Sequence, residues 1–402
     1  MPEIAEIARI VHFLRIHLVG KTVKTASAID DANVFGKVGT TGSEVTAALS
    51  GKKVVSAGNQ GKYFWIVLSK PPHLVMHFGM TGWIHIKGER TAYTNYYNKM
   101  KADEADAWPP KYWKFQLKTD DAVELAFTDP RRFGRVRLVN CDGKSIRQNT
   151  PLVENGPDPV VDTDVFTEAF LSQKMRSRHV PIKALLLDQA AISGIGNWVG
   201  DEVLYQAKLH PEQYCNEFSD EQITKLYGAI RYVCQLAVDK LGDSDQFPKD
   251  WIFHYRWGKG TKGPGHLPSG EKLAFLTVGG RTSCYAPDLQ KKTGGVVPGV
   301  KEELAESDEE GPKPKKSSKS KTVAKKAESK AEPEVKQPRK RKVKAEDSED
   351  EKSVKKGKVV QAKSQAKSSA RTNGTGADVN IAQDAEEEGG RRRSGRLRTK
   401  PT

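Results

Sequence analysis

Apolar residues recur every three or four positions near the start of the chain, at Ile4, Ile7, Val11, Leu14 and Leu18. This spacing is typical of one face of an α-helix, and Gly20 follows as a stop signal. The pattern predicts an amphipathic helix over residues 3–19. Glu3 and Glu6 lie near its start, on similar sides of the helix.

Short runs rich in β-branched and aromatic residues follow the first helix, separated by Gly, Lys or Asp. They cover residues 54–56, 63–68, 73–78, 83–86, 113–117, 122–127 and 135–139. Closely spaced short strands of this kind favour a β-sandwich, with the first helix packed against it. Residues 87–110, rich in Tyr, Asn, Lys and Asp, are predicted to form a long exposed loop.

The apolar period becomes helical from Pro159 onwards. The predicted helices cover residues 164–174, 181–187, 197–207 and 220–241. Gly194, Gly196 and Asn197 open the third of them, so their backbone N–H groups could bind a phosphate or could form a plain helix–helix turn. Residues 251–257 and 272–285 predict a small β-rich annex.

Composition divides the chain further. Residues 301–402 contain no Phe, Trp or Tyr and carry 28 Lys and Arg against 19 Asp and Glu, which predicts a disordered tail. We therefore expect an α+β protein with an N-terminal β-sandwich over 2–158, a helical domain over 159–245, a hairpin region over 246–295 and a tail over 296–402. The net charge of +15 permits a polyanionic partner.

Several classes of protein are disfavoured by the sequence. The four cysteines form no Cys-x-x-Cys pair, which argues against a zinc ribbon and a disulfide framework. The sequence contains no run of 18 apolar residues, so no membrane span is predicted. The acidic start does not resemble a secretory signal.

The second residue of the chain is a candidate nucleophile. Removal of Met1 would leave Pro2 with a free secondary amine, and such an α-amino group titrates near pH ~8. A deprotonated amine can form a Schiff base with a carbonyl carbon, and the carboxylates of Glu3 and Glu6 could move protons around it. A proline at the first position of a helix is the alternative explanation of the same residue.

Five short motifs occur in one order along the chain: Pro2-Glu3-x-x-Glu6, Gly61-Lys62-Tyr63, His77-Phe78-Gly79-Met80-Thr81-Gly82, Asp129-Pro130-Arg131-Arg132-Phe133-Gly134 and Gly194-Ile195-Gly196-Asn197. With them, residues 2–290 closely resemble the formamidopyrimidine-DNA glycosylases. The resemblance implies an enzyme that excises oxidised bases from double-stranded DNA and then nicks the abasic strand. It also implies a β-sandwich followed by a helix-two-turn-helix domain, with DNA between them.

The resemblance assigns roles to the first motifs. Pro2 matches the nucleophile that attacks C1′ of the deoxyribose, and Glu3 the general acid that protonates the opening sugar ring. Glu6 matches a second carboxylate that acts directly or positions the N-terminus. Lys62 matches a lysine that meets the phosphate beside the lesion, although a solvated lysine at a strand end would look the same.

Other residues match DNA-binding positions of the family. Met80, Arg131 and Phe133 match the side chains that fill the gap left by the extruded nucleotide, where an apolar wedge and an arginine replace lost stacking and pairing. Arg132 matches a position with a structural or phosphate-binding role. The phosphate contacts of the helical domain and the hairpin would come from Lys183, Asn197 and Arg281.

The chain departs from bacterial members of the family in its hairpin, where Cys284 is the only cysteine in place of four. This region resembles the plant and fungal branch, whose hairpin holds no zinc. We therefore expect no metal and no other cofactor, with Arg281 kept at the hairpin tip. Aromatic packing would replace the metal through Trp251, Phe253, Tyr255 and Phe275.

The branch resemblance favours formamidopyrimidines, further-oxidised guanine and abasic sites over 8-oxoguanine as substrates. Two alternatives stay open: an endonuclease-VIII-like enzyme for oxidised pyrimidines, and a non-catalytic protein that binds chromatin or damaged DNA. The basic clusters at residues 338–344 and 391–398 predict nuclear import. We expect a monomer with no membrane partner.

Overall fold

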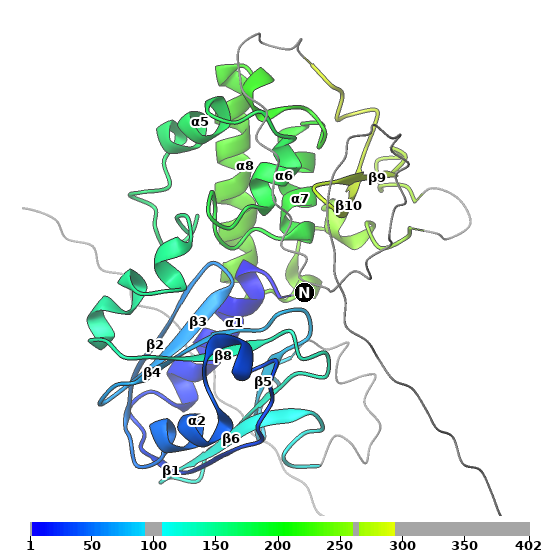
Figure 1. Ribbon diagram of the computed structural model, residues 1–402. Helices are drawn as coiled ribbons and strands as arrows, with labels where there is room; N and C mark the ends of the chain where they lie inside the picture. Colours follow the sequence, from blue (N-terminus) through cyan, green and yellow to red (C-terminus); the bar gives the residue numbers. More distant parts are fainter. Residues whose placement is uncertain (1, 93–106, 260–264, 294–402) are drawn as a thin grey trace, which may run out of the picture. The chain divides into compact units, whose positions relative to one another are not determined.

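The computed structural model describes residues 2–92, 107–259 and 265–293. Its first part is the predicted β-sandwich, made of two antiparallel four-stranded sheets (Figure 1). One sheet has the order β1 (Val23–Ala28), β6 (Trp113–Thr119), β7 (Glu124–Thr128) and β5 (Trp83–Ile86). The other has the order β2 (Val54–Gln60), β3 (Tyr63–Leu68), β4 (His73–His77) and β8 (Arg135–Val139).

Aromatic side chains fill the space between the two sheets. Phe78 is stacked on Phe127 with ring centroids 5.8 Å apart, and Phe115 is stacked on Phe127 at 5.6 Å. These rings are buried, because alternate residues of each strand point inward. Two elements of this region, β1 and the helix α2 (Gly42–Leu49), were not predicted from the sequence.

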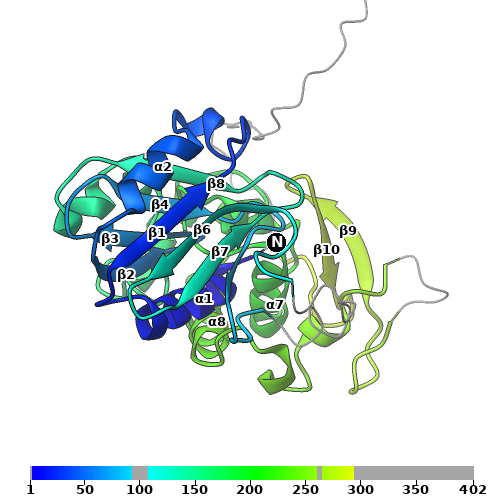
Figure 2. The same ribbon diagram turned by 90° about the horizontal axis from the view of Figure 1, so that it is seen from below.

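The predicted first helix is α1 (Ile4–His17), which lies between strands β2 and β3 and the helix α8 (Figure 2). Its apolar face belongs to two cores. Ile4 and Ala5 are part of the core of the helical region, whereas Ile7 and Ile10 are part of the core of the sandwich. A single amphipathic helix therefore joins the two regions from its first turn onwards.

The helical region consists of α5 (Glu168–Arg176), α6 (Ile182–Leu187), α7 (Asn197–Ala207) and α8 (Asp220–Asp239). Their buried faces enclose one hydrophobic core. Helix α8 begins with a capping box, in which Ser219 accepts a hydrogen bond from the N–H of Gln222 and Gln222 accepts one from the N–H of Ser219. No helix of the described residues is long and apolar enough to span a membrane.

A two-stranded antiparallel hairpin of β9 (Ala274–Val278) and β10 (Arg281–Tyr285) packs against α7 (Figure 1). Of the four aromatic residues expected to pack it, Tyr255 and Phe275 lie in the hydrophobic cluster beneath the hairpin. Trp251 and Phe253 instead belong to the helical core. Within the predicted annex, residues 274–278 and 281–285 form strands, whereas residues 252–254 form a 3₁₀ turn. Most of the predicted loop 87–110, and the tail from residue 294, lie outside the described residues.

Candidate active site

The carboxylate of Glu3 lies at the N-terminus of α7, almost two hundred residues later in the chain. Its Oε1 accepts a hydrogen bond from the N–H of Trp198 and its Oε2 one from the N–H of Val199, each 3.1 Å long. The first N–H groups of a helix have no intrahelical partner and carry positive partial charge, so they favour a carboxylate. Glu3 is 2% exposed and therefore held in one orientation.

Glycine residues make this approach possible. A Cβ on Gly196 would lie 2.1 Å from Cδ of Glu3. The carbonyl of Gly194 accepts the N–H of Ile4 at 3.1 Å, which fixes the first turn of α1 on the turn before α7. Pro2, directly before Glu3, is partly exposed. The Gly-Ile-Gly-Asn turn thus binds the chain's own N-terminal segment through its helix N-terminus.

Glu6 supports the N-terminal segment from the other side. Its Oε2 accepts the N–H of Glu3 at 3.0 Å, and its Oε1 accepts Nε1–H of Trp198 at 3.2 Å. Burial, and then the charge of Glu3, raises the pKa of Glu6 to about 7. These contacts fit the positioning role among the two alternatives for Glu6, although its part in the chemistry stays a prediction.

Lys62 lies at the turn between β2 and β3 and is 7% exposed. The preceding Gly61 has φ +57, and its N–H donates to Oδ2 of Asp158 at 2.7 Å. Burial lowers the pKa of Lys62 to about 8, with Glu3 opposing and Arg281 adding to the effect. Within residues 2–92, 107–259 and 265–293, the Lys62 ammonium has no hydrogen bond or ion pair, so it is poised to meet an anion.

The residues predicted to fill a vacated base position lie on two loops. Met80 is partly exposed on the turn after β4, and Phe133 is 47% exposed on the turn before β8. The guanidinium of Arg131 lies 5.0 Å from the centre of the Phe133 ring. A Cβ on Gly79 would come within 2.4 Å of the Phe133 backbone, so the two loops are in direct contact.

Arg132, on the same loop, has a structural contact. Its Nε donates to both carboxylate oxygens of Asp31, at 3.1 and 2.9 Å, and Lys114 pairs with the same carboxylate at 2.9 Å. Arg132 itself has φ 61 in the left-handed region, which only a firm anchor stabilises. Of the two roles expected for Arg132, the structural one has direct support.

The prediction that Lys183 contacts a DNA phosphate is wrong for this structure. Its side chain is 0% exposed, and its ammonium donates to Asp201 at 2.5 Å and to the carbonyl of Asn197 at 2.7 Å. The side chain of Asn197 donates to the carbonyl of Thr282 at 2.9 Å, which ties α7 to the hairpin. Arg281, in contrast, is exposed at the start of β10.

The structure therefore brings together two groups of the predicted residues. Glu3 and Glu6 lie at the N-terminus of α7, and the charges of Glu3, Arg281 and Glu6 all act on Lys62. Met80, Arg131 and Phe133 form the second group, on the adjoining loops of the sandwich.

Sequence reasoning missed the buried acids that hold these groups. Asp129 is 0% exposed and joins the two loops, and Asp158 holds the turn before Lys62. Asp31 anchors Arg132. The Asp-Pro pairs at 129–130 and 158–159 signal turns but not the partners across them, and Asp31 has no such pair.

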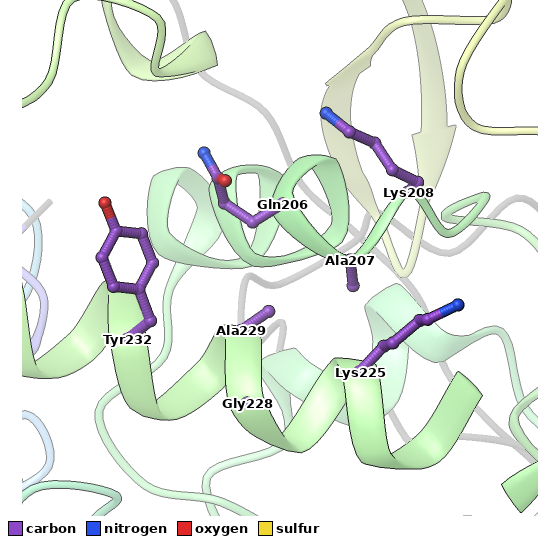
Figure 3. A pocket seen from close by; sticks show the side chains of 7 residues that line it. All are labelled: Gln206, Ala207, Lys208, Lys225, Gly228, Ala229 and Tyr232. Carbon is purple, nitrogen blue, oxygen red and sulfur yellow. The ribbon is translucent and has the colours of Figure 1, made fainter. Parts of the chain in front are cut away.

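The hollow shown in Figure 3 does not coincide with these residues. An open hollow of about 500 Å³ lies between the C-terminal end of α7 and α8, at the opposite end of α7 from Glu3 (Figure 3). Its lining is formed by Gln206, Ala207, Lys208, Lys225, Gly228, Ala229 and Tyr232. In the part of the chain that the structure describes, no three His, Cys, Asp or Glu side chains are grouped to hold a metal ion. The absence of a cofactor stays a prediction.

Comparison with known proteins agrees with this arrangement. Residues 1–136 match the formamidopyrimidine-DNA glycosylase N-terminal domain, and residues 155–248 match the H2TH domain of the same glycosylases. A formamidopyrimidine-DNA glycosylase of Arabidopsis thaliana is 40% identical over 297 residues, which cover 73% of this chain and 72% of the plant protein. One from Pelotomaculum thermopropionicum is 30% identical over 261 residues, 62% of this chain and 85% of the relative.

Solved structures show the same fold. The Lactococcus lactis formamidopyrimidine-DNA glycosylase bound to DNA with an abasic site has a TM-score of 0.58 at 23% identity. The match covers 72% of this chain and 100% of that chain. MutM in complex with DNA containing carbocyclic 8-oxoguanine has a TM-score of 0.57 at 25% identity, with the same coverage.

Proposed function

Because this chain belongs to the formamidopyrimidine-DNA glycosylase family, we propose that it is a bifunctional enzyme of base excision repair. As a DNA glycosylase it removes oxidised purines, and as a lyase it then cleaves the strand at the abasic site. The observation that carries this proposal is the fixed carboxylate of Glu3, held beside Pro2 by two backbone N–H groups of α7.

The proposed reaction begins at the amine of Pro2. Its neutral nitrogen forms a bond to C1′ as the bond from C1′ to the base breaks, and the base leaves with the proton that the amine gives up. Glu3 protonates the ring oxygen O4′ as the C1′–O4′ bond breaks, which leaves an iminium. The iminium withdraws electrons, so the Glu3 carboxylate takes a proton from C2′ and the 3′ phosphate departs in β-elimination. A δ-elimination then releases the 5′ phosphate, and water hydrolyses the Schiff base. No step requires a metal or another cofactor.

Two cations would hold the DNA strand during this reaction. Lys62 is a nearly buried ammonium without a hydrogen bond or ion pair among the described residues, and Arg281 is an exposed cation in its electrostatic field. Two such charges close together repel one another until an anion lies between them. We assign both to phosphates beside the lesion, which positions the duplex without reading its sequence.

Extrusion of the damaged nucleotide leaves a gap in the duplex, which Met80 and Phe133 would fill. Both are exposed at least in part on loop turns, where ordinary core residues would be buried. Arg131 lies against the Phe133 ring and would donate hydrogen bonds to the orphaned base.

We propose formamidopyrimidines, further-oxidised guanine and abasic sites as the main substrates, with 8-oxoguanine a weaker one. The resemblance to the plant branch supports this ranking, and the Arabidopsis relative is the more similar of the two compared above. An endonuclease-VIII-like preference for oxidised pyrimidines is the second candidate, which the set of Met80, Arg131 and Phe133 disfavours. Excision kinetics on duplexes carrying each lesion decide between them.

The remaining proposals concern the protein in the cell. The basic clusters 338–344 and 391–398 lie outside the described residues, and we propose that they direct the protein to the nucleus. The tail would also add salt-sensitive affinity for DNA. We propose that the enzyme acts as a monomer.

Borohydride reduction tests the central proposal. We expect wild-type protein to be trapped covalently on abasic DNA, and Pro2→Gly to weaken trapping. Glu3→Gln should abolish base excision while DNA binding is retained. Binding without any trapping would instead support the alternative of a non-catalytic DNA-binding protein, and equal loss of binding and excision in Glu3→Gln would contradict its role as the acid.

A further inference from the structure

Asp201 of α7 lies at the centre of a buried cluster of charges. Its Oδ1 accepts the ammonium of Lys183 at 2.5 Å, and its Oδ2 accepts Nε and Nη2 of Arg256 at 3.1 and 2.6 Å. The three side chains are 0%, 1% and 6% exposed for Lys183, Asp201 and Arg256. Because burying charges is costly unless every partner is well placed, the geometry of this cluster is tightly defined. We call it the Asp201 cluster.

The Asp201 cluster is bonded directly to the hairpin. Oδ2 of Asp201 accepts the backbone N–H of Cys284 at 3.1 Å, three residues after Arg281. A second connection runs from Lys183 to the carbonyl of Asn197 and from the Asn197 side chain to the carbonyl of Thr282. Both connections end on β10, one at each side of Ser283.

The hairpin depends on contacts with the rest of the protein for its direction, and the hydrophobic cluster beneath it and the Asp201 cluster both supply such contacts. It contains two strands only, and an isolated two-stranded hairpin is marginally stable in water. Its turn contacts α6, where a Cβ on Gly279 would lie 3.3 Å from Cα of Ala184. Helix α7 admits Lys183 because position 200 is a glycine, whose Cβ would lie 2.9 Å from the Lys183 ammonium. Glycine at these two positions thus leaves room for the hairpin turn on α6 and for Lys183 on α7.

The cluster and the active site also share one electrostatic environment. The Asp201 cluster contains two cations and one anion. Burial lowers the pKa of Lys183, and the charges of Asp201 and, less strongly, Glu3 oppose this effect. Glu3 acts on Lys62 in the same way. Loss of one member would therefore disturb both the hairpin and the groups at the N-terminus of α7.

We propose that the Asp201 cluster is the positioning device of the hairpin: it fixes β10 on α7 and thereby places Arg281 beside Lys62 for the DNA backbone. Asp201, Lys183 and Arg256 are positioning residues that do not touch DNA. This inference rests on the DNA contact proposed above for Arg281.

A double-mutant cycle tests it. Dissociation constants are measured for wild type, Arg256→Met, Arg281→Ala and the double variant on a duplex with a tetrahydrofuran abasic analogue. We expect each single change to weaken binding about tenfold and the double variant to be no weaker than either, because Arg256 acts through Arg281. Arg176→Met serves as the control, since Arg176 pairs with Asp220 on the surface at 2.8 Å, and should bind like wild type.

The outcomes separate the two proposals. Losses that multiply to about 100-fold, or unchanged binding by Arg256→Met, would overturn the inference while leaving the contact of Arg281 intact. Unchanged binding by Arg281→Ala would refute that contact and the inference with it. If Arg256→Met does not fold, the same cycle is run with Arg256→Lys, which keeps the charge but not the paired hydrogen bonds to Asp201.

Discussion

The hydroxyl of Thr81 donates a hydrogen bond of 2.7 Å to Oδ1 of Asp129 and so joins the two loops that carry Met80 and Phe133. The same carboxylate accepts the N–H of Arg131 at 3.1 Å and that of Gly134 at 2.6 Å. All the hydrogen bonds converge on one side chain that is 0% exposed. The two loops that carry Met80 and Phe133 therefore behave as one unit.

Asp129→Asn should separate these loops. An amide offers one acceptor oxygen and turns an N–H₂ group toward another donor, so at least one donor loses its partner. We expect the free energy of unfolding to fall by about 1–3 kcal/mol and lesion excision to slow. Urea unfolding and single-turnover excision measure the two effects. Asp142→Asn is the control, because this exposed carboxylate accepts only a local N–H from Lys144 at 2.8 Å. Equal losses in both variants would contradict the special role of Asp129.

Gly196→Ala should slow base excision without disturbing helix α7. Gly196 has φ −118, which alanine adopts freely, and the three atoms nearest to the added methyl group all belong to Glu3. Displacement of the Glu3 carboxylate is expected to slow excision about 100-fold, with DNA affinity retained. Gly228→Ala on α8 is the matched control, since no atom lies within 4 Å of its added methyl group. Wild-type excision by Gly196→Ala would show that the position of Glu3 is unimportant.

Glu6 predicts a pH dependence of stability. Its pKa is about 7 in the folded protein against 4.5 ordinarily, so the folded state holds a proton that the unfolded chain releases between these values. The stabilising contribution is therefore complete below pH 4.5 and is lost as the pH rises through 7. Relative to Glu6→Gln, wild type should lose about 3 kcal/mol of unfolding free energy across this range. Urea titrations of both proteins at several pH values measure the difference, and parallel curves would refute the assignment.

Lys62 predicts a pH dependence of binding. Its pKa is lowered to about 8, so the free protein loses this charge above pH 8. If the ammonium meets a phosphate, the affinity for abasic DNA should fall above pH 8 by up to about tenfold per pH unit, because binding then takes up one proton. Lys62→Met should bind more weakly below pH 8 and lose this dependence. Fluorescence anisotropy measures both, and an unchanged slope in the variant would exclude Lys62 as its source.

Elements with a strong local pattern could be predicted from the sequence. Strand β3 and helix α7 have the expected bounds, because a continuous β-branched and aromatic run and a Gly-Asn start specify them. Strand β1 was missed since its Lys, Thr, Ser and Ala residues show little preference, and pairing with β6 makes it a strand. Helix α2 had a signal, as Thr41 and Glu44 form a capping box.

The site residues, like the helices and strands, could be predicted only where a local motif marks them. Motifs identified the residues around the N-terminus of α7 and on the sandwich loops. The sequence does not show which side chains are buried or which residues far along the chain they contact, and Lys183 is the clearest case. A lysine near a helix start looks like a phosphate ligand until Asp201, eighteen positions later, is seen to enclose it.

The bond between Glu3 and α7 has a consequence for biosynthesis. Glu3 is translated almost two hundred residues before the amides of Trp198 and Val199 that hold its carboxylate. Nascent or truncated chains that lack α7 therefore lack the backbone groups that fix Glu3. If the proposed function is correct, such fragments would have no positioned acid and would not cleave DNA.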